Sequence, residues 1–272
     1  MMFYRLLPVP ALLLLVFAYL VPLGQVLVLS VMDPSPGLGN YALLFSNAGI
    51  ARMLSNTVQI CAVTVIVSLL LGYAVSYALV QSRGFGRRVM LGCVLLPLWV
   101  SVLARAFAWI TLLRREGLLN SWLKAAGLIE DPLPLMWNMF GVCVGMVHYM
   151  LPFAILAMAA HMGSIDRSLV AAARGLGAGP REAFLRVFLP LSLPGVAGAA
   201  VLVTIFSLGF YVTPALLGGG RVLMIAEYIS VQIHDMLRWG LGAMLASSMV
   251  LAIFALLVVA RLVGLRTLPR AG

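Results

Sequence analysis

The most constraining feature of this sequence is a series of apolar runs that are too long for the core helices of a soluble protein. The stretch Leu241–Leu265 carries a single charged residue, Arg261, and about 20 apolar residues are enough to cross the ~30 Å hydrocarbon core of a bilayer as a helix. Hydrophobic residues make up 63% of the chain and charged residues 10%, whereas a soluble domain is about half apolar and about a quarter charged. Membrane β-strands would give short alternating segments instead. The sequence therefore predicts an all-α integral membrane protein.

We expect six transmembrane helices in a single domain covering residues 1–272. The apolar runs lie at about 6–32, 53–80, 89–113, 133–162, 195–217 and 241–265. The first run could instead be a cleaved signal peptide, because Arg5 precedes its apolar core. However, that core is longer than the usual 7–15 residues and no small-x-small cleavage site follows it. We therefore expect the first run to remain as a span.

The distribution of positive charge orients these spans. With the N-terminus inside, eleven of the 18 Lys and Arg residues fall in cytoplasmic segments and six outside, and Arg105 lies within the third run. Cytoplasmic loops of membrane proteins carry the excess of Lys and Arg, so we expect both termini in the cytoplasm. This bias accounts for the net charge of +10. No basic cluster alternates with aromatic residues, so we expect no nucleic-acid partner.

The chain lacks the sequence motifs of common catalysts. Its single lysine, Lys124, lies in SWLKAAG, which excludes the G-x-x-x-x-G-K-[ST] loop that binds nucleotide phosphates. It also lacks H-E-x-x-H, G-x-S-x-G and a pair of acids within a span. The three cysteines fall within spans without metal-ligand spacing, and small buried apolar side chains explain them. We expect a non-enzymatic chain with no cofactor and no metal of its own.

A polar segment, residues 164–194, separates the fourth and fifth runs. Apolar residues recur in its first half at helical spacing, at Ile165, Leu169, Ala172 and Leu176. This pattern predicts a short amphipathic helix, with Ser164 as its N-cap and Asp166 at the positive end of its dipole.

The second half of the segment predicts another short helix. Gly177 and Gly179 can take the left-handed conformations that end a helix, and Pro180 and Glu182 suit the first turn of the next one. Phe184, Leu185 and Phe188 would form its apolar face, and we expect Pro190 and Pro194 to break it before the fifth span.

Physical chemistry alone leaves two interpretations of this pair of helices. The pair could lie in the membrane interface with its arginines on anionic lipid. Alternatively it could dock a cytoplasmic protein, because the small residues Ala171–Ala173 allow close approach of another surface.

A resemblance favours docking. The residues AAARGLGA and VFLPLSLPG resemble the EAA loop of type I ABC importer permeases, in which Glu-Ala-Ala is followed by a glycine, then an aliphatic residue and Leu-Pro. The positions that fit this pattern are Ala172, Ala173, Gly177, Val187, Leu189 and Pro190. Ala171 occupies the position where the family usually has a glutamate.

The resemblance extends over nearly the whole chain. The stretches SNTVQI, RAFAWITLL, YMLPFAILAM and FYVTPALLGGG are similar to the spermidine/putrescine (PotB/PotH-like) group of these permeases. This implies a bacterial inner-membrane subunit that forms half of a pathway for a small solute, first of all a polyamine. Other amines, amino-acid derivatives, phosphonates and ferric ion are alternative cargoes. An autonomous secondary transporter is an alternative of another class, disfavoured because acids within the spans and an inverted repeat are missing.

The family also implies partners. These are a second homologous permease subunit in a heterodimer, two cytoplasmic ATPase subunits holding ATP and Mg, a periplasmic solute-binding protein, and membrane lipid. The loop helix would act as a coupling helix set in a groove of the ATPase. Its expected coupling residues are Ala171, Ala172, Ala173, Arg174, Gly177, Ala178, Arg181 and Phe184.

Arg105 is the most informative residue within a span. A charge in the bilayer costs roughly 2.5–3.5 kcal/mol on insertion scales, so it should face protein or water, or snorkel to the outer interface. We expect it beside Trp109, one turn later, as a gate or structural partner rather than a ligand for a cation. The remaining pathway candidates offer aromatic faces that could hold a cation, or lie next to them: Tyr149, Phe210, Tyr211 and Thr213.

The outer segments 33–52 and 114–131, with an expected short helix at Val222–Met236, would form a platform for the binding protein. That helix carries two acids, Glu227 and Asp235.

Overall fold

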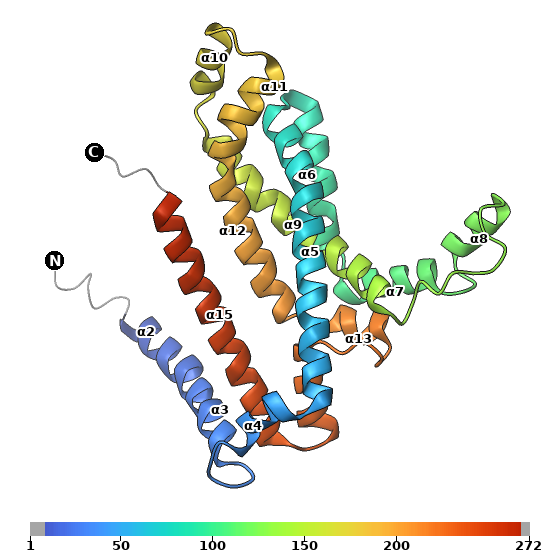
Figure 1. The fold of residues 1–272 in the computed structure, drawn as a ribbon, viewed down its shortest axis with the longest axis vertical. Coiled ribbons are helices and arrows are strands. Elements are labelled where there is room, and N and C mark those ends of the chain that lie inside the picture. The colour runs from blue at the N-terminus through green and yellow to red at the C-terminus, as the bar shows by residue number, and fades with distance from the viewer. Residues whose placement is uncertain (1–8, 268–272) are drawn as a thin grey trace.

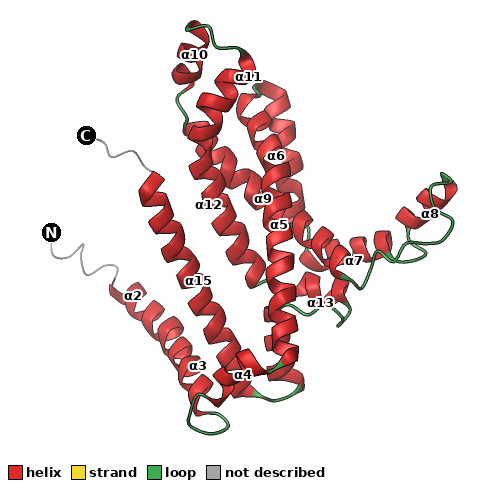
Figure 2. Cartoon of the chain, viewed as in Figure 1, coloured by secondary structure: helices red, strands yellow, loops and turns green. Residues whose placement is uncertain are grey.

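The computed structural model describes residues 9–267, with side chains up to Leu262, and every regular element within this range is helical (Figures 1 and 2). The expected first span begins at Leu6, so its first three residues lie outside the described range. The elements in chain order are α2 (Val9–Leu15), η1 (Val16–Leu20), α3 (Val21–Met32), α4 (Gly39–Ser46), α5 (Ala48–Gln81), α6 (Gly84–Trp99), α7 (Val102–Leu113), α8 (Leu118–Ala125), α9 (Met139–Ser164), α10 (Arg167–Gly175), α11 (Pro180–Ala183), η2 (Phe184–Phe188), α12 (Leu189–Leu208), α13 (Val212–Gly218), α14 (Ile225–Ser230), η3 (Val231–Asp235) and α15 (Trp239–Thr267).

Within residues 9–267, five helices are long and apolar enough to cross a membrane, or six if a bent pair counts as one span. The five are Val9–Met32, Ala48–Gln81, Met139–Ser164, Pro180–Leu208 and Trp239–Leu262. The bent pair is Gly84–Trp99 with Val102–Ala125, whose two parts meet at 97°. Pro97 lies near the end of α6, where it removes one backbone donor and crowds the preceding turn. The sequence predicted a single helix over 89–113, but the chain turns after Trp99. As a result α7 packs against α9 and α13, and α8 extends away from the bundle (Figure 1).

The centre of the bundle is α9, which packs against α5 on one side and α12 on the other. Its buried methionines have almost no exposed surface: Met146, Met150, Met158 and Met162. The facing stripe of α5 is small and polar, because Thr64, Ser68, Gly72 and Ser76 are all buried. A Cβ on Gly72 would lie 2.8 Å from the terminal methyl of Met158, so the two helices approach closely. Small residues permit such contacts between membrane helices.

The helix entering α12 is continuous, contrary to expectation. Pro180–Leu208 forms one apolar helix, so the predicted break at Pro190 and Pro194 is wrong. The π-helical turn Phe184–Phe188 ends two residues before Pro190. Such a wider turn can accommodate the backbone groups that a proline leaves without partners. The expected fifth span, 195–217, is divided in the structure, because α12 ends at Leu208 and α13 is separate.

The N-terminal helix α2–α3 lies outside the central bundle and contacts α15 at one end (Figure 1). The carboxylate of Asp33, at the end of α3, accepts a hydrogen bond of 2.6 Å from the backbone of Gly240, at the start of α15. Most of the large side chains of α2 and η1 are exposed, including Phe17 and Tyr19. In a membrane these surfaces face lipid or another subunit.

Candidate functional site

The polar loop after α9 begins with a capped helix. The Asp166 carboxylate accepts a 2.9 Å hydrogen bond from the backbone N–H of Ser168, and this contact lowers the pKa of Asp166. Asp166 is therefore the N-cap of α10. The prediction that Ser164 caps this helix is wrong, because Ser164 is the last residue of α9 and donates its hydroxyl to the carbonyl of His161.

The end of α10 is a Schellman motif. The N–H of Ala178 bonds to the carbonyl of Ala173, and that of Gly177 to the carbonyl of Arg174, both at 3.1 Å. Gly177 has a φ of +95°, which a residue with a Cβ rarely adopts. The left-handed conformation predicted for Gly177 is confirmed. The same prediction for Gly179 is wrong, since Gly179 is extended at a φ of −66° and serves as the N-cap of α11.

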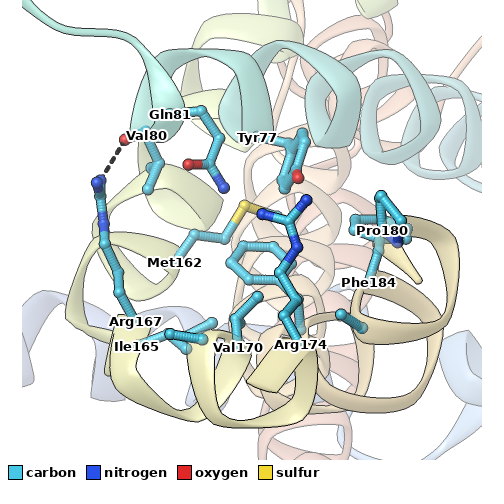
Figure 3. Close-up of a pocket in the computed structure, with 13 residues that line it drawn as sticks. Tyr77, Val80, Gln81, Met162, Ile165, Arg167, Val170, Arg174, Pro180 and Phe184 are labelled. Carbon is cyan, nitrogen blue, oxygen red and sulfur yellow. Dashed lines mark hydrogen bonds between the residues drawn. The ribbon is translucent and has the colours of Figure 1, made fainter. Parts of the chain in front are cut away.

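The two faces of α10 have different surroundings. Leu169 and Leu176 are 48% and 90% exposed, and Ala172 is exposed with them. The opposite face lines a cavity of about 490 Å³, to which α10 contributes Arg167, Val170, Ala171 and Arg174. The predicted coupling residues are therefore divided. Ala172 lies on the outer face, whereas Ala171 and Arg174 face the membrane helices (Figure 3).

Phe184 also points toward the membrane helices rather than outward. Its ring makes edge contacts with Tyr77 and Tyr73 of α5, at 5.2 and 6.3 Å between centroids, and lies 5.9 Å from Phe188. The hydroxyls of Tyr73 and Ser192 are 2.8 Å apart. These contacts join the loop to both α5 and α12. Phe184 therefore anchors the loop to the bundle, which differs from the direct coupling contact predicted from the sequence.

A second, shallower hollow of about 340 Å³ lies on the other side of the loop. It is lined by three further predicted coupling residues, Ala173, Gly177 and Ala178, together with Glu182 and Arg186 among others. Glu182 and Arg186 form a salt bridge of 2.8 Å, with side chains 46% and 79% exposed. Exposed pairs of this kind contribute little stability. The remaining predicted residue, Arg181, is exposed on α11.

Four of the predicted pathway residues meet in one cluster, where α7, α9 and α13 touch. Arg105, Trp109, Tyr149 and Thr213 surround a space of about 10 Å³. A space of this size holds at most about one water molecule. The cluster is therefore closed in this conformation.

Arg105 lies in this cluster and forms no salt bridge with any residue that the structure describes. It is 8% exposed, and its guanidinium carbon lies 4.3 Å from the centroid of the Tyr149 ring, a cation–π arrangement. Its Nε and Nη1 atoms have no hydrogen-bond partner among the described residues. Trp109 donates its indole N–H to Nδ1 of His148 at 3.1 Å. Arg105 thus faces protein. This is one of the two positions expected from the sequence, the other being the outer membrane interface.

Phe210 extends this cluster, and Tyr211 does not. The Phe210 ring lies 4.3 Å from that of Tyr149, whereas Tyr211 is 45% exposed and does not line the space. His148, Phe153 and Phe206 also belong to this region and were not predicted as pathway residues from the sequence. Phe153 contacts both Tyr149 and Phe206, so the aromatic row continues along α9 and α12. Spacing within one helix could have indicated Phe153, but only packing reveals Phe206.

An acidic side chain is buried where α14 packs against α15 and α5. Glu227 of α14 is 5% exposed, and burial raises its pKa to about 7 against a weaker opposing hydrogen bond from the backbone of Met224. Its Oε2 atom has no hydrogen-bond partner within the described range. The expected outer helix at Val222–Met236 corresponds to α14 and η3. However, Glu227 points inward, and only Asp235 of its two acids is exposed.

Comparison with known proteins identifies the family of this helical chain. Residues 74–268 match the family described as binding-protein-dependent transport system inner membrane component. The chain belongs to this family. As a member, it is a multi-pass inner-membrane protein and a permease subunit of an ABC importer. The predicted all-α importer fold and family are confirmed.

Two relatives and one structure illustrate the similarity. The spermidine/putrescine transport system permease protein PotB of Haemophilus influenzae (strain ATCC 51907 / DSM 11121 / KW20 / Rd) is 31% identical over 204 residues, which cover 75% of this permease and 71% of the relative. PotB of Salmonella typhimurium (strain SL1344) is 30% identical over 216 residues, covering 79% and 74%. A bacterial alginate ABC transporter, solved in complex with an alginate pentasaccharide-bound periplasmic protein, matches with a TM-score of 0.77 at 18% identity. That match covers 95% of this permease and 92% of the other chain, and at this identity it shows the shared fold.

Proposed function

We propose that this permease forms half of the translocation pathway of a polyamine importer, with spermidine- or putrescine-like cargo. The observation that carries the proposal is the 31% identity to a spermidine/putrescine permease over 204 residues. The aromatic row of Tyr149, Phe153, Phe206 and Phe210 supports it, because aromatic faces attract ammonium groups. No acid has to be present in the pathway for such contacts.

The ATPase would drive transport through its contact with α10. The exposed face of Leu169, Ala172 and Leu176 is apolar and would lie in a groove of a separate ATPase subunit that holds ATP and Mg. Two such ATPases would bind two permeases, this chain and a homologous partner. Closure of the ATPases on ATP would then draw the two α10 helices together.

The continuous helix Pro180–Leu208 would carry this movement across the membrane. Phe184 ties its first turns to α5, so the loop and the wall of the bundle would move together. At its far end, α12 leads through Gly209 and Phe210 into α13. Because α13 carries Thr213 to the Arg105 cluster, a shift of α12 would open or close that cluster.

Arg105 would act as part of the gate in this scheme. Its guanidinium covers the Tyr149 ring in the closed cluster, and a fixed positive charge is an electrostatic barrier to small cations. The loop end would face the cytoplasm together with both termini. The opposite end, with α4, α8 and α14, would receive a periplasmic solute-binding protein.

Arg105 also favours a second candidate cargo. A buried guanidinium with two unpaired donor atoms would suit a solute that carries a carboxylate or phosphonate group. Amino-acid derivatives and phosphonates are such solutes. Ferric ion and simple amines gain no support from this cluster.

The test is uptake by the complete importer. The permease would be purified with its partner subunits and reconstituted into proteoliposomes with ATP inside and the binding protein outside. We expect ATP-dependent uptake of labelled spermidine or putrescine, and competition by unlabelled polyamine but not by an amino acid or an alkylphosphonate. Competition in the opposite sense would favour the second cargo. Uptake by the permease alone, driven by an ion gradient, would refute the assignment to a coupled importer.

A further inference from the structure

A cavity beneath α10 has no role in the scheme above. It measures about 490 Å³ and is enclosed by the last turns of α5 and α9, the inner face of α10, and the start of the helix from Pro180 (Figure 3). A volume of this order is typical of ligand sites. Its walls are mainly apolar, with Val80, Met162, Val170, Phe184 and Phe188 among them.

The charged groups of the cavity are all positive. Arg167 and Arg174 are its only charged lining residues, and no acidic side chain is among the residues that surround it. They are two helical turns apart and therefore lie on one face of α10, with Ala171 between them. Arg167 donates from Nη2 to the carbonyl of Val80 at 2.7 Å, which holds its side chain against the end of α5. Arg174 reaches across the cavity toward Tyr77 and Met162 (Figure 3).

The two arginines suit an anionic ligand, and the position of the cavity indicates which class of anion would bind. Its lining includes Tyr77, Val80 and Gln81, the end of α5, and Met162 and Ile165, at the end of α9. Because both long helices end here and the polar loop begins, this level of the chain would lie among the lipid headgroups of a membrane. An inorganic anion would leave most of the apolar wall uncovered. An acidic side chain of the ATPase would meet the outer face of α10, whereas this cavity opens on the inner face.

We propose that this cavity binds the headgroup of an anionic phospholipid of the inner leaflet, with its phosphate between Arg167 and Arg174 and its glycerol and upper acyl chain against the apolar wall. Basic pockets between membrane helices on the cytoplasmic side are suited to such headgroups. The bound lipid would hold α10 at a fixed distance from α5. The effect on transport rests on the proposed coupling role of α10, whereas lipid binding does not.

The binding test uses the complete importer in nanodiscs of phosphatidylglycerol and phosphatidylcholine, followed by native mass spectrometry of the lipids that stay bound. We expect retention of phosphatidylglycerol over phosphatidylcholine. Each arginine near a membrane surface contributes about fivefold to the binding of an anionic lipid. In Arg167→Gln/Arg174→Gln the preference for phosphatidylglycerol should therefore fall by about thirtyfold. The matched control is Arg87→Gln/Arg88→Gln, which removes two exposed positive charges from α6 and should leave the preference unchanged.

Ala171→Glu gives an independent test. A glutamate at this position lies one turn from both arginines and would supply an internal anion, so the preference for phosphatidylglycerol should also be lost. If the double arginine variant does not assemble, Arg174→Gln alone should lower the preference about fivefold.

Four results would overturn the proposal. One is equal retention of the two lipids by the unmodified importer, and another is equal loss in the control variant. Displacement of the lipid by millimolar inorganic phosphate would assign the site to a free anion. Loss of ATPase co-purification in the arginine variants, with lipid retention intact, would assign the arginines to the ATPase. A failure of polyamine uptake would refute the proposed function only, because lipid retention is measured without transport.

Discussion

Gly177→Val is the most direct perturbation of the proposed coupling loop. The backbone of Gly177 has a φ of +95°, and a Cβ placed there meets no atom within 4 Å. The cost of the substitution is therefore backbone strain and not a clash. For a residue with a Cβ the left-handed region costs roughly 1–2 kcal/mol, and more for a β-branched residue. Only two backbone hydrogen bonds close the Schellman motif, so this strain is large enough to open it.

An open motif would change the direction in which the chain leaves α10 toward Pro180. The bundle itself should be unaffected, because Gly177 is exposed. A strain of 1–2 kcal/mol shifts a two-state equilibrium by roughly 5- to 30-fold, and we expect transport per ATP hydrolysed to fall within that range. The measurement is the ratio of polyamine uptake to ATP hydrolysis in proteoliposomes, with thermal stability of the purified complex followed in parallel.

Two further substitutions separate backbone conformation from bulk. Gly177→Asn should retain most of the coupling, because asparagine tolerates the left-handed region better than other residues. Gly175→Ala is the matched control, since Gly175 is the last residue of α10, has no positive φ and faces open space. It should couple normally. Unchanged coupling in Gly177→Val, or equal loss in Gly175→Ala, would refute the reasoning.

Three other outcomes follow from the structure. Phe184→Ala should lower the free energy of unfolding by less than the 3–5 kcal/mol of a fully buried Phe→Ala change, because Phe184 is half-buried. It should also lower the ratio of uptake to ATP hydrolysis, because the loop loses its contacts with α5. Phe184→Leu should retain more of the stability and more of the coupling in the same uptake assay. Arg105→Met should leave the melting temperature of the complex unchanged or raised, since it removes buried donors that cost about 1–3 kcal/mol each when unpaired, while ATP-independent leak of labelled cation through proteoliposomes should increase; an unchanged leak would argue against the gate. Burial raises the pKa of Glu227 to about 7, so the folded protein holds this proton more tightly than the unfolded chain, and stability should fall as pH rises from about 4.5 to about 7. Hydrogen exchange in α14 and η3, corrected for its intrinsic pH dependence, should become faster as the pH rises across that window. In Glu227→Gln this acceleration should be absent.

Much of the coupling loop could be predicted because its signals are local. The stop at Gly177 and the start at Pro180 depend on the conformational preferences of single residues, and both appear in the structure where the sequence indicated them. The assignment of Ser164 as a cap was wrong because two residues only two positions apart, Ser164 and Asp166, both suited the role. The choice between them depends on where α9 ends, which its packing against α5 and α12 helps to decide.

The direction of each face was less predictable. The apolar row that includes Leu169 and Leu176 indicated an amphipathic helix, and a helix in a soluble protein would bury that row. In this chain the row is exposed and the arginine-bearing face is turned toward the membrane helices. The apolar face would therefore be covered by a partner, which a single sequence does not contain.

The sequence by itself determined that this chain spans a membrane, that a polar loop interrupts its spans, and that nucleotide hydrolysis by a phosphate-binding loop is excluded. Hydropathy and motif spacing carry these properties within windows of about 20 residues. Only the tertiary structure decided that Pro180–Leu208 is one helix, that the chain bends by 97° between Gly84–Trp99 and Val102–Ala125, and that Arg105 covers Tyr149. These three features depend on contacts between helices that are far apart in the chain. Which side chains meet is set by the packing of the helices, and a single sequence does not give that packing.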